Sequence, residues 1–204
     1  MTKEIRAFDF EVRAEENERG KVLTGRPIVF NQRTNVGWYD EIIEDHALDS
    51  TDLKDVRFLV NHNTNMIPLA RSRNNNANST MQMEVVDGQG MDIRVNLDTE
   101  NNADARSLYS AVERGDISGM SFMFVVDKDS WDDVDSDHPV RTIRSFKQVL
   151  EVSAVTFPAY EQTNIQARGL SDALDSAKES LESAKAEKRE RERLIQKIKI
   201  LAEV

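Results

Sequence analysis

Cysteine is absent from this sequence of 204 residues. Its absence excludes disulfide bonds, a cysteine nucleophile and every zinc site built from thiolates. Long apolar runs are also lacking: the longest lies near residues 120–126, far short of the roughly 18 residues that a membrane span needs. The first residues are not followed by the apolar stretch of a signal peptide. We therefore expect a soluble, cytoplasmic protein with no membrane partner.

Basic side chains are too few to balance the acidic ones. There are 27 Lys and Arg against 37 Asp and Glu, a formal net charge of −10, which argues against nucleic acid as the main partner. Residues 171–204 hold eight basic and eight acidic side chains, so residues 1–170 carry the whole surplus. Aromatic residues, glycine and proline also end before residue 171. We predict a β-rich domain over residues 1–170 and a charged helical tail over residues 171–204.

The tail has the spacing of one long helix. Positions alternately four and three residues apart form a seam that is apolar at both ends and charged in the middle: Leu170, Leu174, Ala177, Leu181, Ala184, Lys188, Arg191, Ile195 and Ile198. The stretch Lys185–Arg193 alternates in charge, as a solvated helix does. The tail is therefore a coiled-coil or docking helix, or else a lone solvated helix or flexible segment.

Residues 1–170 mostly show the alternation of β-strands. Two alternating runs, 81–85 and 91–97, flank a glycine-containing turn at 87–90 and predict a hairpin. An early run alternates at Phe8, Phe10 and Val12. Further strands are expected at Val22–Phe30, Trp38–Ile43, Val56–Asn61, Gly119–Val126 and Val140–Thr156.

Helices are few in this part of the chain. Asp104 can cap one that Gly115 ends, and Asp45–Leu53 is a weaker candidate. The fold class that these patterns favour is α+β and mainly β, with an antiparallel barrel or sandwich, surrounding helices and a long C-terminal helix.

Three histidines are present: His46, His62 and His138. His62 follows an apolar strand and precedes a polar loop, where a rigid scaffold presents side chains to a cleft. Its ordinary pKa suits a general base, although a hydrogen-bonded structural histidine is also compatible with this context. His46 lies at an expected helix start, and His138 lies in an acidic loop.

Because the chain has no cysteine, serine is the first nucleophile to consider. Ser121 lies at the start of an expected strand, after the helix that Gly115 ends and a tight connecting stretch. That position could give it a fixed side chain and nearby backbone amides for an oxyanion. A small residue chosen for packing is the plainer interpretation, and Ser118 is the rival serine.

Glu151 is a carboxylate inside the apolar run Val149–Pro158. A buried carboxylate needs a partner because desolvating an unpaired charge is costly. A histidine oriented by the carboxylate is one solution, as in catalytic triads. An arginine such as Arg57 or Arg71 is an equally ordinary one.

No sequence motif indicates a cofactor or a metal. A P-loop, GxGxxG, HExxH and GxSxG are all missing. The aspartate-rich stretch Asp127–Asp137 lacks the spacing and central glycine of an EF-hand, so we interpret it as a solvated excursion between two strands. The histidines are scattered along the sequence. We therefore expect no cofactor and no metal ion.

Residues 8–167 resemble the prohead maturation proteases of tailed bacteriophages, a family related in fold to the herpesvirus capsid-assembly protease. The resemblance depends on the joint order of several short pieces. These pieces are Gly25–Asn31, Glu41–Ile43, Leu59–Asn63, Ile67–Ala70, Gly90-Met91, Arg114-Gly115, Gly119–Phe124 and Glu151–Tyr160. The sequence departs from the family at Asp45–Leu48, where a Pro-Gly-Ala-Phe turn is common, and at Ala70, where glycine is common.

The resemblance implies a serine endopeptidase with an assemblin-like barrel. His62 matches the family histidine, Ser121 the nucleophile and Glu151 the acidic third member. Ser121 is preferred to Ser118 because it occupies the family's serine-before-phenylalanine position. The resemblance further implies that the substrate is the scaffolding part of the major capsid protein, inside an immature shell in the host cytoplasm. Self-cleavage is expected near residues 161–171 or within the tail, and self-association is possible.

Overall fold

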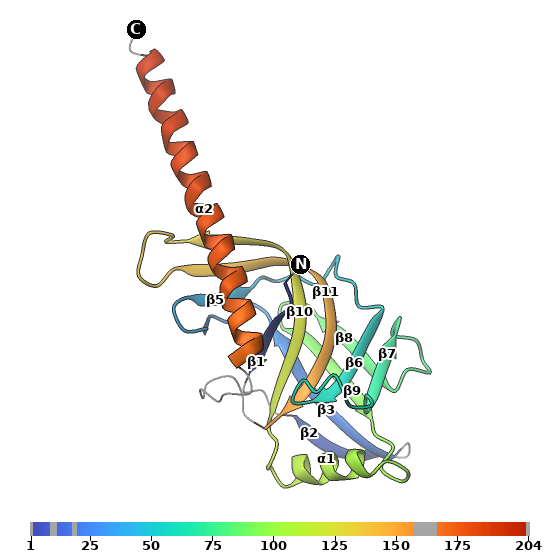
Figure 1. Cartoon of the computed structure of the whole chain (residues 1–204). Helices are drawn as coiled ribbons and strands as arrows, with labels where there is room; N and C mark the ends of the chain where they lie inside the picture. The colour runs from blue at the N-terminus through green and yellow to red at the C-terminus, as the bar shows by residue number, and fades with distance from the viewer. Residues whose placement is uncertain (1, 9–11, 18–19, 157–166, 203–204) are drawn as a thin grey trace.

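The chain forms two β-sheets, a short helix and a long C-terminal helix in a computed structural model that describes residues 2–8, 12–17, 20–156 and 167–202 (Figure 1). The first sheet has the strand order β1-β10-β11-β5-β4, and β6 and β7 extend it beside β11. Its strands are β1 (Glu4–Phe8), β4 (Thr34–Asn35), β5 (Asp40–Ile43), β6 (Asp55–Val60), β7 (Ala70–Arg73), β10 (Gly119–Asp132) and β11 (Val140–Val155). The second sheet has the order β2-β3-β9-β8, from β2 (Arg13–Asn17), β3 (Gly20–Val29), β8 (Met81–Val86) and β9 (Gly90–Asn96).

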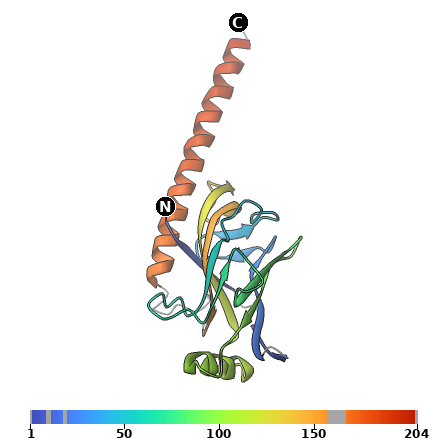
Figure 2. The same cartoon turned by 90° about the vertical axis from the view of Figure 1, so that its right-hand side faces the viewer.

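The two sheets share one hydrophobic core. Alternate residues of the first sheet, such as Phe122 and Phe124 of β10, are fully buried in the same cluster as Met91 and Val95 of β9. Helix α1 (Ala103–Glu113) adds one apolar side to this core and lies at the end of the molecule opposite the free end of the C-terminal helix (Figures 1 and 2). Because strand side chains alternate between faces, the residues between the core phenylalanines point to the other face of the first sheet.

Several predicted elements are confirmed. The hairpin of β8 and β9 pairs Val86 with Gly90 around the predicted turn. Helix α1 ends as predicted, with Gly115 at φ +77°, although Asn102 rather than Asp104 caps its start by accepting two backbone N–H groups. Of the early alternating run, Phe10 lies outside the described residues, and the described parts form β1 and β2 in different sheets.

Other expectations differ from the structure. In place of a closed antiparallel barrel, the described strands form open sheets, and β5 and β6 run parallel to β11. The sheets therefore do not confirm the assemblin-like fold that the resemblance implied. Residues 45–50 form successive turns instead of a helix, since His46 adopts a left-handed backbone conformation with φ +66°. Half of the aspartate-rich stretch is strand, because β10 continues to Asp132 opposite β11.

Helix α2 (Ala167–Ala202) confirms the predicted long C-terminal helix. Its first half packs on the body: Ala177 and Leu181 lie in a small cluster with Tyr39, Trp131 and Val134. Its second half projects away from the sheets in both views (Figures 1 and 2). No helix of the described residues is long and apolar enough to cross a membrane.

Candidate active site

Three neighbouring strands of the first sheet bring the predicted site residues together. Ser121 lies on β10 and Glu151 on β11, while His62 follows the end of β6, and β11 pairs with both of the other strands. Ser121 lies directly opposite Ser153 of β11. Directly opposed residues share a face of the sheet, as do residues two apart along a strand. Ser121, Ser153 and Glu151 therefore share the face that points away from the core.

His62 is the partner of Glu151. The imidazole Nδ1 and the carboxylate Oε1 are 2.5 Å apart, and both side chains are almost entirely buried. The other two candidate partners, Arg57 and Arg71, both bind Asp55 instead. A carboxylate only accepts hydrogen bonds, so Nδ1 carries the proton and Nε2 of the neutral ring is left as an acceptor.

The acceptor nitrogen of His62 has no partner of its own. Nε2 is buried and makes no hydrogen bond within the described parts of the chain. Buried polar atoms are normally paired, so an unpaired one requires an explanation such as a catalytic role. Among the residues that the structure describes, three other buried side-chain atoms are unpaired, on Thr34, Trp38 and Ser72, but none of these is a basic nitrogen oriented by a carboxylate. The arrangement is the one that a general base needs.

The backbone around His62 is strained and held by β11. Asn61 and His62 both adopt left-handed conformations, with φ +49° and φ +57°. Asn61 donates its backbone N–H to the Ala154 carbonyl, and its side-chain oxygen accepts the backbone N–H of Thr156. Asparagine tolerates the left-handed conformation, so the strain falls mainly on His62; such strain costs on the order of 1–3 kcal/mol per residue and is concentrated at functional sites.

The proposed nucleophile is present but is not bonded to His62. Ser121 is fully buried, and its hydroxyl donates to the backbone carbonyl of Arg6 on β1, at 2.8 Å. Strand β1 pairs with β10 so that Ala7 lies opposite Ser121. The serine–histidine hydrogen bond of an active triad is thus not formed in this structure. Without substrate, catalytic hydrogen bonds are often long or poorly aligned, and they tighten only in the complex with substrate.

Comparison with known families supports the chemistry that this geometry indicates. The sequence matches the profile of the caudovirus prohead serine protease family over residues 8–179. The chain belongs to this family. Searches of curated proteins and of solved structures found no match to it. The prohead protease match contains the three candidate residues and ends within α2 at residue 179, beyond the composition change after residue 170.

The remaining candidates of the prohead protease lie outside this arrangement. Ser118 is exposed, just before β10 begins. His138 is partly exposed, and its Nε2 lies 2.8 Å from Asp40 Oδ1 at the surface. The carboxylate of Asp40 has a pKa below its ordinary value, chiefly because His138 hydrogen-bonds to it and also because Arg33 lies beside it.

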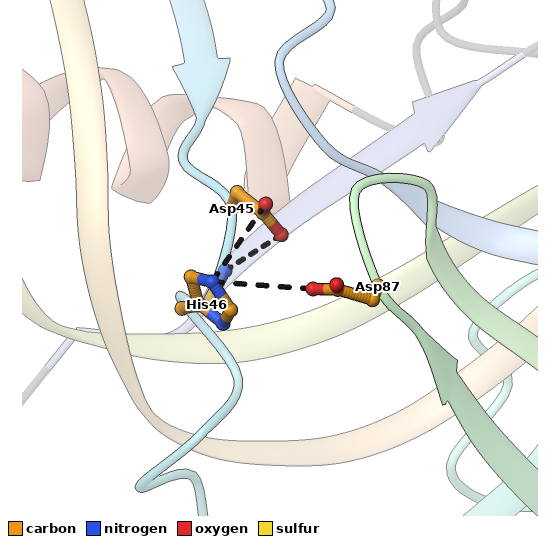
Figure 3. A group of neighbouring side chains, drawn as sticks. All are labelled: Asp45, His46 and Asp87. Atoms are coloured by element: carbon orange, nitrogen blue, oxygen red, sulfur yellow. Dashed lines mark hydrogen bonds and ion pairs between the residues drawn. The ribbon is translucent and has the colours of Figure 1, made fainter.

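Sequence reasoning missed one grouping of possible metal ligands. His46 lies beside Asp45, and both lie near Asp87 from the turn between β8 and β9 (Figure 3). Three oxygen and nitrogen ligands of this kind could contact a divalent ion. However, His46 and Asp87 are largely exposed, and the imidazole Nε2 is already 3.8 Å and 3.9 Å from the two carboxylates. Exposed acidic groups of this kind are common at protein surfaces without a bound ion.

Proposed function

We propose that this prohead protease is an endopeptidase in which Ser121, His62 and Glu151 form the catalytic triad. In the first step Ser121 Oγ attacks the carbonyl carbon of the scissile peptide bond while its proton moves to His62 Nε2. Glu151 fixes the imidazole tautomer and stabilises the imidazolium. The proton then passes to the leaving amine, and the same nitrogen next activates the water that hydrolyses the acyl-enzyme.

The observation that carries this proposal is the orientation of His62. Glu151 holds Nδ1 at 2.5 Å, and the buried Nε2 has no partner in the part of the chain that the structure describes. Ser121 lies on the adjacent strand and on the same face as Glu151. For catalysis its hydroxyl must leave the Arg6 carbonyl, to which it is bonded in this structure. Ser121 can therefore react with a substrate only after its hydroxyl has broken the hydrogen bond to the Arg6 carbonyl.

The proposed substrate is the scaffolding part of the major capsid protein within the immature shell. Family membership supports a role in capsid maturation. The protease itself is a second proposed substrate, with cleavage near residues 161–171 or in the tail. Residues 161–166 lie outside the described part of the chain, and residues 167–171 begin α2.

We further propose that residues 171–204 act as a docking helix for the capsid or scaffold partner of the domain over residues 1–170. This proposal is supported by the large apolar side chains that the projecting half of α2 exposes, since exposed apolar patches often serve as interaction surfaces. These side chains are Leu194, Ile195, Ile198, Ile200 and Leu201. Cleavage before or within this helix would release the protease from that partner.

Co-expression of the Ser121→Ala variant with the capsid protein tests the proposal. We expect the scaffolding part to remain uncleaved, and the intact mass of the purified variant to stay constant while the wild-type chain shortens. Normal scaffold removal by Ser121→Ala contradicts the assignment of the nucleophile. Ser118→Ala is the matched control, because Ser118 is exposed and lies three residues away; it should cleave like the wild type.

A non-catalytic assembly protein with a degenerate protease domain is the second candidate. One observation favours it: Ser121 is fully buried and its hydroxyl is bonded to β1. A fluorophosphonate probe, which reacts with activated serines, separates the two functions. Labelling at Ser121 that is lost in His62→Ala supports the enzyme, whereas a folded wild-type chain that is never labelled supports the assembly protein.

A further inference from the structure

Ser153 is a fully buried serine that sequence reasoning did not single out. It lies on β11 two residues after Glu151 and directly opposite Ser121. The sequence pattern there is only a small residue within an apolar strand. Its side chain nevertheless occupies the centre of the candidate site, on the same face as the triad.

The Ser153 hydroxyl connects two members of that triad. It donates to Glu151 Oε2 at 2.6 Å and accepts the backbone N–H of His62 at 3.1 Å. Because Glu151 Oε1 binds His62 Nδ1, both oxygens of the carboxylate are occupied and the carboxylate cannot rotate freely. The hydroxyl also accepts the backbone N–H of His62, which lies in the strained turn after β6 and outside the hydrogen-bond ladder of the sheet.

The contact with the His62 backbone matters because of the left-handed turn. A non-glycine residue at φ +57° persists only where surrounding contacts fix it. Asn61 is held by the Ala154 carbonyl, and His62 is held by Ser153. Without the hydroxyl, the His62 amide loses its acceptor and Glu151 Oε2 loses its donor in the same step.

We propose that Ser153 is a positioning residue, which sets the direction of Glu151 and the backbone of His62 so that Nε2 points toward the reacting serine. It acts through these two residues and does not contact the substrate. The positional part of the proposal stands on geometry alone, whereas its consequence for catalysis rests on the proposed function.

Four variants test this role. Ser153→Ala removes the hydroxyl, Ser153→Cys replaces it with a weak hydrogen-bonding group of similar size, and Ser153→Thr retains it. Ser72→Ala is the matched control: Ser72 is also a fully buried strand serine, but its hydroxyl has no hydrogen-bond partner among the described residues. Circular dichroism and thermal melts identify the variants that fold, and Ser153→Cys serves if Ser153→Ala does not fold.

Hydrogen exchange of the free protein, followed by NMR, gives the first readout and requires no activity. In Ser153→Ala or Ser153→Cys, the His62 amide and its Nδ1 proton should exchange about tenfold faster or more. The Asn61 amide, which donates to Ala154, should keep its rate, and Ser72→Ala should match the wild type. Unchanged exchange at His62, or equal acceleration at Asn61 and His62, overturns the positioning role.

The second readout is the rate of fluorophosphonate labelling as a function of pH. Loss of a hydrogen bond to a charged group predicts a fall of between about tenfold and a hundredfold in Ser153→Ala. The pH at which labelling is half-maximal should also shift, and Ser153→Thr should restore most of the rate. If Ser121→Ala abolishes labelling and Ser153→Ala matches Ser72→Ala, the catalytic part of this inference fails and the triad stands. If Ser121→Ala is labelled like the wild type, the proposed function fails, and hydrogen exchange still decides the role of Ser153.

Discussion

The protein contains two buried polar regions on the first sheet, and they differ in how completely their groups are paired. The ionic cluster consists of Glu4, Arg6, Glu41, Asp129 and Arg141, of which all but Asp129 are almost fully buried. Arg141 binds Glu4, Glu41 and Asp129, and Arg6 binds Glu4, Glu41 and the Tyr39 hydroxyl. The candidate active site is also buried, but it leaves His62 Nε2 unpaired among the described residues.

The charge states of the ionic cluster follow from this pairing. Burial alone raises the pKa of Glu4, but Arg6 and Arg141 outweigh burial and hold that pKa below its ordinary value. Burial lowers the pKa of Arg141, and its hydrogen bonds and attraction to Glu4 and Glu41 more than reverse the effect. Burial raises the pKa of Tyr39 to about 12. Glu4, Arg6 and Arg141 are thus each held in a single charge state at neutral pH, as suits a structural network and not proton transfer.

This difference in pairing suggests that the ionic cluster serves stability and that the candidate active site serves catalysis. A buried ion pair that loses one member leaves an uncompensated charge, which costs on the order of 3–5 kcal/mol. A catalytic base instead needs one unpaired atom. The two regions meet at β1, where the side chain of Arg6 belongs to the ionic cluster and its carbonyl accepts the Ser121 hydroxyl. The cluster thereby holds the strand that pairs with β10 beside the proposed nucleophile.

The largest expected effect comes from replacing the unpaired nitrogen. His62→Asn retains an amide donor where Nδ1 lies, and asparagine tolerates the left-handed conformation of this position. The variant cannot accept the serine proton, so fluorophosphonate labelling should fall by about ten-thousandfold. The free energy of unfolding, measured by urea denaturation, should change by about 1 kcal/mol or less. Labelling above a tenth of the wild-type rate contradicts the assignment of His62 as the base.

The converse change is Arg141→Met in the ionic cluster. Glu4, Glu41 and Asp129 lose a shared partner, so the free energy of unfolding should fall by about 3–5 kcal/mol. Arg141 contacts none of the triad residues in the described structure, so the folded fraction should be labelled within about threefold of the wild type. Arg26→Met is the matched control. Arg26 binds Asp92 at the surface, with both side chains partly exposed, and its loss should cost about 1 kcal/mol or less.

The ionic cluster also predicts how the free energy of unfolding falls at acidic pH. The folded-state pKa of Glu4 is below 4.5, its ordinary value, so the unfolded chain binds its proton more tightly. Stability from this group is present above about pH 4.5 and is lost as the pH falls through the lower folded-state pKa. Urea denaturation between pH 7 and pH 3 should show this loss. The loss should be smaller in Arg141→Met, and an equal slope in both proteins contradicts the proposed pairing.

Sequence patterns identified the candidate active site better than the ionic cluster. The need of a buried carboxylate for a partner predicted a pairing of Glu151 but left a histidine, Arg57 and Arg71 open, and the structure pairs it with His62. Strand alternation likewise located β8 and β9. These predictions succeeded because each depends on a local period or on a single strong energetic requirement.

Tertiary pairing decided what the sequence patterns missed. Asp129 is a poor strand residue in isolation, yet it lies in β10 because Arg141 and Ser180 bind it there. Ser153 has the same sequence signal as a serine chosen for size. The bond between Ser121 and Arg6 depends on the register of β1 against β10, and no local pattern near residue 121 specifies that register.

The smallest expected effect concerns the connection of α2 to the ionic cluster. Ser180 donates to Asp129 at 2.8 Å and accepts the Trp131 indole N–H at 3.0 Å, so it joins the helix to a strand that carries the cluster. Ser180→Ala should destabilise the docked half of α2 by about 1 kcal/mol, because the apolar contacts of Ala177 and Leu181 remain. Limited proteolysis should then cut the helix a few times faster. Ser183→Ala is the matched control, since its hydroxyl bonds only to the Glu179 carbonyl of the same helix. Equal proteolysis of the two variants would mean that the Ser180 hydroxyl does not help to hold α2, and that the ionic cluster ends at Asp129.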